Sequence, residues 1–130
     1  MFERPERGMK MATPILLKAN GTVIPAMLND TVAAQDFKKR LPFTAAGHRS
    51  AVDYCCRLAS GIFDPAQTQS GWKNGDISLA GGWLAVLFDG EENSSDYRSM
   101  MVIAHIDEKD LGLVKSLPAS VRFTVELAEE

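Results

Sequence analysis

The sequence is poor in the residues that build disulfides and metal centres. It contains two cysteines, Cys55 and Cys56, and two histidines in 130 residues. A disulfide between adjacent cysteines would be strained, and no Cys-x-x-Cys or comparable ligand spacing is present. We therefore expect free thiols, a reducing cytoplasmic setting, no metal site and no bound cofactor.

The sequence also has no basic cluster and no long apolar run. Its 14 Lys and Arg residues are outnumbered by 17 Asp and Glu residues, for a net charge of −3. Nucleic acids and anionic membranes both bind basic surfaces, so neither is an expected partner. No apolar segment approaches the ~18 residues of a membrane helix, which predicts a soluble chain. Nucleotide-binding and serine-hydrolase motifs are absent too.

What the sequence does contain is ordinary globular composition, with 45% apolar and 24% charged residues. A chain of this length is large enough to bury roughly two-thirds of its unfolded surface in a single core. The first residues are charged and lack periodicity. We expect a loose leader over residues 1–13 and one domain over residues 14–130.

Most of the domain alternates between apolar and polar residues, which is the pattern of strands. Seven strands are predicted, at residues 15–19, 22–28, 50–58, 76–80, 83–88, 99–106 and 120–127. Asn20-Gly21 favours a tight hairpin turn between the first two, and Pro25 favours an edge or a bulge in the second.

Two segments have helical spacing instead. Ala33, Phe37 and Leu41 recur every four residues, with Asn29 or Asp30 as the expected N-cap. A second helix is predicted over residues 107–117, with an aspartate cap. Short strands must close or fold over to protect their edges. We therefore predict an all-β closed barrel of about eight strands with two capping helices.

Three segments resemble the cyclophilin-like barrel, in which a helix lies over each open end. Residues 28–37 (LNDTVAAQDF) are similar to the entry into the first cyclophilin helix, and residues 102–117 (VIAHIDEKDLGLVKSL) to the strand and helix before the last strand. Asn74-Gly75-Asp76-Ile77, followed by GWLAVLF at 82–88, resembles a pattern of small prokaryotic cyclophilin-like proteins. The resemblance implies the fold and a pocket.

True cyclophilins carry a catalytic arginine on a Phe-His-Arg strand, and the matching strand here reads Tyr54-Cys55-Cys56-Arg57. Arg57 is thus the catalytic candidate if the protein is a peptidyl-prolyl isomerase, although the Phe-His pair and a following glutamine are missing. The resemblance otherwise implies a binding module of unassigned activity.

Strand alternation places Asp53 and Arg57 on one face, either as a surface charge pair or as part of a cleft. Trp72 lies in a polar segment, where it either plugs a barrel end or lines a cleft. With the loop before the next strand, these residues form the predicted barrel-side site for a small molecule or peptide: Asp53, Arg57, Trp72, Arg98 and Met100. The oligomeric state is left open.

The remaining aromatic and histidine residues favour structural interpretations. Trp83, Leu87 and Phe88 lie in an apolar segment and are predicted to be core residues. His48 is predicted in an exposed loop, and His105 as a partly buried histidine with a partner. The acidic loop at residues 89–96 fails the calcium-loop pattern and is expected to be a solvated turn.

Overall fold

A closed antiparallel barrel organises residues 11–128, the part of the chain that the computed structural model describes. The strands follow one another around the barrel in the order β1-β2-β7-β5-β6-β4-β3-β8. Their bounds are β1 Met11–Ala19, β2 Thr22–Asn29, β3 Phe43–Arg49, β4 Asp53–Arg57, β5 Asp76–Ala80, β6 Trp83–Leu87, β7 Met101–His105 and β8 Ser120–Leu127. The predicted all-β class and closed barrel are confirmed.

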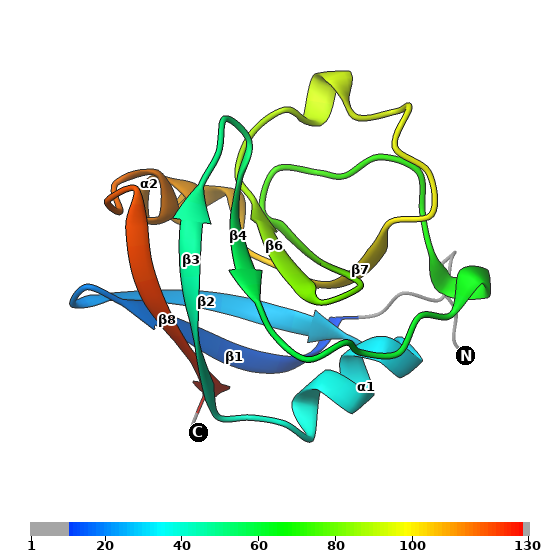
Figure 1. Ribbon diagram of the computed structural model, residues 1–130, viewed down its shortest axis with the longest axis horizontal. Helices are drawn as coiled ribbons and strands as arrows, with labels where there is room; N and C mark the ends of the chain where they lie inside the picture. The colour runs from blue at the N-terminus through cyan, green and yellow to red at the C-terminus, as the bar shows by residue number, and fades with distance from the viewer. Residues whose placement is uncertain (1–10, 129–130) are drawn as a thin grey trace.

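Two short helices lie at opposite ends of the barrel, as Figure 1 shows. The first, α1 (Val32–Lys38), buries Ala33, Ala34 and Phe37. The second, α2 (Leu111–Lys115), buries Val114 and follows the 3-10 turn η3 (Glu108–Asp110). Amphipathic spacing predicted both helices, and their buried faces cover the core at the two ends.

The inward side chains fill the barrel with aliphatic and aromatic residues. Ile15, Leu17 and Ile24 of the first hairpin pack with Tyr54 and Phe123, each at most 1% exposed. The rings of Tyr54 and Phe123 meet edge to face, with their centroids 5.6 Å apart. Because the interior is packed in this way, a binding site has to use outward residues and the connections between strands.

The sequence pattern did not predict β3. The start of the neighbouring strand β4 was therefore predicted too early in the chain. The predicted strand at 50–58 is shorter, because residues 50–52 form the turn between β3 and β4. The inward positions of β3 are Phe43, which packs on Phe37, followed by Ala45 and Gly47, which are too small to continue an apolar alternation. A Cβ at Gly47 would lie 2.9 Å from a ring carbon of Phe123, which explains the small residue. His48 accordingly lies on a strand and not in a loop.

Several local details also differ from the expectation. Strand β1 begins at Met11, inside the predicted leader, of which residues 1–10 lie outside the described part. The N-cap of α1 is Thr31, whose hydroxyl accepts a hydrogen bond from the Ala34 amide at 3.1 Å. The Asn29 side-chain oxygen accepts instead from the amide and hydroxyl of Thr31, while its Nδ2 donates to the Val102 carbonyl, so it is not the cap. Pro25 lies within the closed sheet, beyond the pairs that join β2 to β7.

The Tyr54 hydroxyl ties β4 to the turn before β8. It lies 2.8 Å from the carbonyl oxygens of both Leu117 and Pro118, and Tyr54 is fully buried. We expect Tyr54→Phe to lower the free energy of unfolding by about 1–2 kcal/mol, because it removes a hydroxyl donor from a fully buried position and leaves the Leu117 carbonyl with only its weaker contact to Arg49. Urea unfolding measures this. Tyr97→Phe, at a residue 57% exposed, is the control expected to change stability by less than ~0.5 kcal/mol. Equal stabilities of wild type and Tyr54→Phe would contradict the assignment.

Candidate functional site

A cleft of about 430 Å³ lies on the outer face of β4, β5 and β6. Its floor consists of outward residues that the register sets side by side: Ala85 of β6 pairs with Ser78 of β5, and Leu87 of β6 pairs with Asp53 of β4. The outer wall of the cleft is formed by the connections that precede β5 and β7. Figure 1 shows them as long loops beside the barrel.

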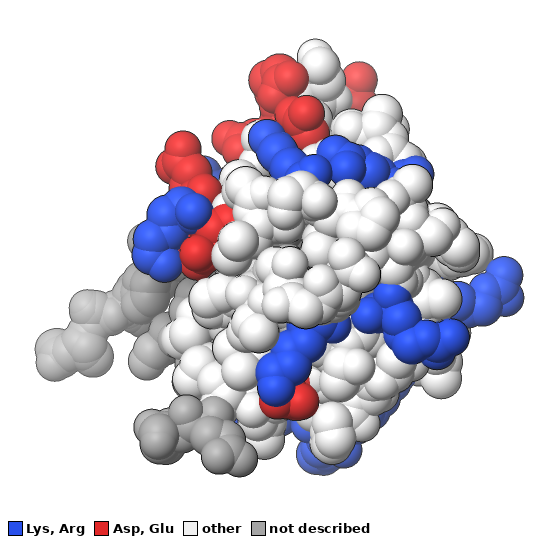
Figure 2. Space-filling view, turned by 90° about the vertical axis from the view of Figure 1, so that its left-hand side faces the viewer, with Lys and Arg blue, Asp and Glu red and all other residues white. Residues whose placement is uncertain are grey.

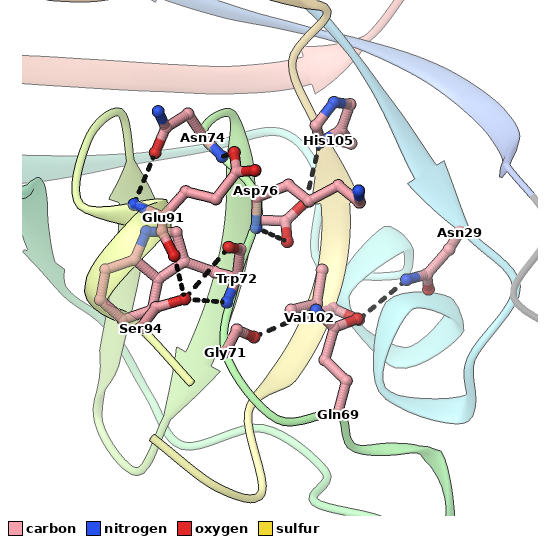
Figure 3. Close-up of polar contacts among 11 residues, drawn as sticks. Asn29, Gln69, Gly71, Trp72, Asn74, Asp76, Glu91, Ser94, Val102 and His105 are labelled. Atoms are coloured by element: carbon pink, nitrogen blue, oxygen red, sulfur yellow. Dashed lines mark hydrogen bonds and ion pairs between the residues drawn. The ribbon is translucent and has the colours of Figure 1, made fainter. Parts of the chain in front are cut away.

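The two connections are hydrogen-bonded to each other along their length. The amides and carbonyls of Gln69 and Met100 bond reciprocally at 3.0 and 2.8 Å. Further along, the Asn74 amide donates to a Glu91 carboxylate oxygen at 2.9 Å, and the Glu91 amide donates to the Asn74 side chain at 3.1 Å. Figure 3 shows both hydrogen bonds between Asn74 and Glu91. This pairing gives the wall a defined shape.

Trp72 is the buried anchor of the wall. Its backbone amide donates to the Ser94 hydroxyl and its indole N–H to the Asp89 carbonyl, both at 2.9 Å. Its ring packs edge to face on Tyr97, with centroids 5.2 Å apart. Of the two interpretations of Trp72, lining a cleft is the one that the structure supports, since the residue lines the cleft and is 8% exposed.

The cleft combines an apolar surface with a few polar groups of different character. Phe63 and Tyr97 are exposed aromatic residues among its lining, and Leu87 and Ala85 provide aliphatic floor. Asp53 is 9% exposed, while Arg98 is exposed at the surface. An acceptor in the floor and a cation at the rim are the polar features that orient a ligand in a mostly apolar cleft.

Asp53 also contacts one of the two neighbouring thiols, both of which are at least partly buried. Its carboxylate accepts hydrogen bonds from the Ser50 hydroxyl and, at 3.2 Å, from the Cys55 thiol. Burial, followed by the hydrogen bond to Asp53 and its charge, raises the pKa of Cys55 to about 11. Burial, with smaller contributions from Cys55 and Asp53, raises the pKa of Cys56 to about 12. Both thiols therefore stay protonated at neutral pH, which suits structural and not nucleophilic cysteines.

Four of the five residues predicted for the site line this cleft: Asp53, Trp72, Arg98 and Met100. Arg57 does not. It shares the outer face of β4 with Asp53, as strand alternation predicts, but its guanidinium carbon lies 4.7 Å from the centroid of the Trp83 ring. Trp83 is 42% exposed, so its predicted place in the core is wrong, whereas Leu87 and Phe88 are buried.

The sequence interpretation missed Ser78 and the wall residue Ser94. Ser78 falls at an outward position of a predicted strand, but no motif marks it. Ser94 lies in the acidic loop, where the residue is 2% exposed and its hydroxyl accepts a hydrogen bond from the Trp72 amide. Only the long-range contact between residues 72 and 94 gives it a role.

Charged side chains and residue types that can bind metals also occur over the rest of the described surface. Figure 2 shows Lys and Arg side chains in small groups with uncharged surface between the groups, and Asp and Glu side chains mainly in the upper part of the view. Within residues 11–128, no group of three or more His, Cys, Asp or Glu side chains is arranged to hold a metal ion. No helix in this part of the chain is both long and apolar enough to cross a bilayer.

Comparison with known proteins agrees with the fold. The profile of the Cyclophilin-like family matches residues 17–126, and the chain therefore belongs to that family. The solution structure of a hypothetical protein from Archaeoglobus fulgidus is similar, with a TM-score of 0.68 over 96% of this chain and 100% of that one. The two are 16% identical in sequence, so the similarity shows a shared fold. No match is found among curated proteins.

The burial of Cys55 and its contact with Asp53 predict a slowly reacting thiol. In a Cys56→Ala background, we expect iodoacetamide at pH 8 to alkylate Cys55 at least about tenfold more slowly than a free cysteine, because its thiolate fraction is lower. Asp53→Asn removes the charge and weakens the hydrogen-bond acceptor, so it should speed alkylation. Burial remains, so the rate should not reach that of free cysteine. A Cys55 alkylation rate equal to that of free cysteine in the Cys56→Ala protein with Asp53 intact would contradict the raised pKa.

Proposed function

We propose that the protein binds a small molecule or a short peptide in the cleft over β4, β5 and β6, in the reducing cytosol of a prokaryotic cell. The observation that carries the proposal is Ser78. This residue lines the cleft and is 3% exposed, yet its hydroxyl has no hydrogen-bond partner among residues 11–128. Buried hydroxyls are normally satisfied, so an unpaired one in a cleft is a feature that a ligand completes.

Asp53 supports the same conclusion from a different direction. Buried carboxylates are usually paired with a cation, but no ion pair within the described part of the chain includes Asp53. Its two neighbours, Ser50 and Cys55, donate through uncharged groups. An N–H or O–H group on a ligand would add a donor to this carboxylate.

The rim indicates what the rest of the ligand contains. Arg98 has five N–H donors in a planar fork, which suits a carboxylate or carbonyl oxygen. Phe63 and Tyr97 are more than half exposed and supply flat apolar surface beside it. The matching ligand has an aromatic or aliphatic body, a donor for the floor, and an acceptor for Arg98. Capped dipeptides and aromatic amino-acid derivatives have all three.

Peptidyl-prolyl isomerisation is not favoured by this geometry. The mechanism considered for it needs the Arg57 guanidinium to face the prolyl bond, whereas that group stacks on the Trp83 ring outside the cleft lining. A protease-coupled proline-peptide assay comparing wild type with Arg57→Ala tests the point. Isomerase activity lost specifically in Arg57→Ala would revive the enzyme interpretation.

The binding proposal is tested with a panel of capped dipeptides and aromatic carboxylates. A compound that binds the folded state raises the melting temperature, so thermal shift selects probes and calorimetry gives their affinities. Arg98→Ala should weaken a selected carboxylate by about 10–100-fold, which corresponds to the ~1.5–3 kcal/mol of a charged hydrogen bond. Arg98 is exposed, so stability should change by less than ~0.5 kcal/mol.

Arg57→Ala is the matched control, because it removes an arginine from the same outer face. It should leave probe affinity unchanged and cost stability about 0.5–1 kcal/mol through the lost contact with Trp83. Ala85→Phe should block the cleft floor and abolish binding. Equal loss of affinity in Arg57→Ala and Arg98→Ala, or tight binding to Ala85→Phe, would refute this location of the site.

A further inference from the structure

A second groove, of about 360 Å³, lies over the β1–β2 hairpin and shares no lining residue with the cleft. It forms where β2 separates from its neighbour, because β2 pairs with β7 only at Met27 and Leu28. Pro14 and Pro25 give it apolar walls, and His105 and Asp110 lie among its polar residues. Its distinctive feature is the way in which His105 is held.

His105 is oriented by a buried carboxylate from the next strand. Its Nδ1 atom lies 2.7 Å from Oδ1 of Asp76, which is 5% exposed, and Figure 3 shows the imidazole directed at this carboxylate. The second oxygen of Asp76 accepts a hydrogen bond from the Lys73 amide at 2.9 Å. Both oxygens of Asp76 are therefore engaged, one by the ring and one by the backbone.

Gly75 allows the turn that carries Asp76 to lie close to the end of β7, which carries His105. Its φ is +109°, its carbonyl accepts a hydrogen bond from the Ile106 amide at 2.7 Å, and a Cβ there would collide with the Ile106 carbonyl oxygen. Only glycine lets the turn lie so close to the end of β7. Residues 74–77 resembled a pattern of small prokaryotic cyclophilin-like proteins and residues 102–117 a strand and helix of the cyclophilin-like barrel, and here these two segments meet as Asp76 and His105.

The contact fixes which ring nitrogen carries the proton. A carboxylate only accepts hydrogen bonds, so Nδ1 of His105 is the donor and Nε2 of the neutral ring is left as an acceptor. The two ring nitrogens face in nearly opposite directions, so Nε2 points away from Asp76. Within residues 11–128, no side chain or backbone group forms a hydrogen bond with Nε2. A buried carboxylate behind a histidine is the arrangement that orients imidazoles toward bound groups.

We propose that the groove over β1 and β2 is a second ligand site, in which Nε2 of His105 accepts a hydrogen bond from the hydroxyl or amine of a small, mostly apolar molecule. The charges beside it favour such a donor. Lys109 is already paired, at 3.0 Å from Asp110 and 3.9 Å from Asp107. These three lining residues sum to one negative charge, which disfavours a carboxylate ligand.

The probes are 3-phenylpropanol, 3-phenylpropylamine and 3-phenylpropanoate, which share a body and differ in the polar end. At pH 8, amide chemical-shift titration should show the alcohol and the amine binding near Met27 and His105, and the carboxylate at least about tenfold more weakly. The alcohol offers only a hydrogen-bond donor, whereas the amine also carries a positive charge. The difference between their affinities therefore measures the contribution of charge attraction.

Asp76→Asn is the decisive variant. The Lys73 amide still needs an acceptor, so the new amide oxygen faces Lys73 and its NH₂ group faces Nδ1 of His105. Nδ1 then becomes the acceptor and the proton moves to Nε2, with the shape of the groove unchanged. We expect alcohol and amine affinity to fall at least about tenfold, and long-range ¹H–¹⁵N spectra to show the tautomer of His105 reversed. The signals of His48 serve as the internal control.

Two further variants keep the test independent of how well Asp76→Asn folds. His105→Ala removes the acceptor from a partly exposed position, and Met27→Trp narrows the groove from an exposed one. Both should abolish alcohol binding, whereas Arg98→Ala in the first cleft should not affect it. A wild-type spectrum with the proton on Nε2, or alcohol affinity unchanged by His105→Ala, would overturn the proposal. Failure of the cleft proposal would leave this one standing.

Discussion

Closure of the sheet by β8 is the constraint on which both candidate sites depend. This last strand pairs with β1 through residues 124–127 and with β3 through residues 120–125, so the sheet has no free edge. The interior is then filled with packed side chains, and every polar group with a function has to lie on the outside or in a connection. The closed barrel provides a rigid surface on which Asp53, Ser78 and His105 hold fixed positions.

The two sites use this surface in different ways. In the first, two connections hydrogen-bonded to each other form a wall beside β5 and β6, and Trp72 and Ser94 anchor it. In the second, a strand separates from its neighbour, and a histidine at the end of β7 faces the gap with a buried aspartate behind it. The first candidate site is thus formed by two long connections between strands. The second is formed by a gap in the pairing of β2 with β7.

Strand alternation predicted most of the barrel, together with the outward face shared by Asp53 and Arg57. It failed at β3, where Phe43 is followed on the inward face by only Ala45 and Gly47, so that no apolar alternation is visible. It also failed to tell Arg57 from Arg98, because stacking on Trp83 depends on a neighbouring strand. The Asp76–His105 contact was unpredictable for the same reason, since its partners are 29 residues apart. Side-chain partners across strands follow from register, which the sequence only partly specifies.

The most direct test of the central claim, that the cleft over β4, β5 and β6 binds ligands, is a chemical-shift map of the whole protein with a mixed fragment library. The account predicts that the largest shifts of aromatic carboxylates cluster at the amides of Ser78 and Ala85 and at the indole N–H of Trp72. Shifts confined to α1 or spread evenly over the surface, with these three signals unmoved, would contradict it.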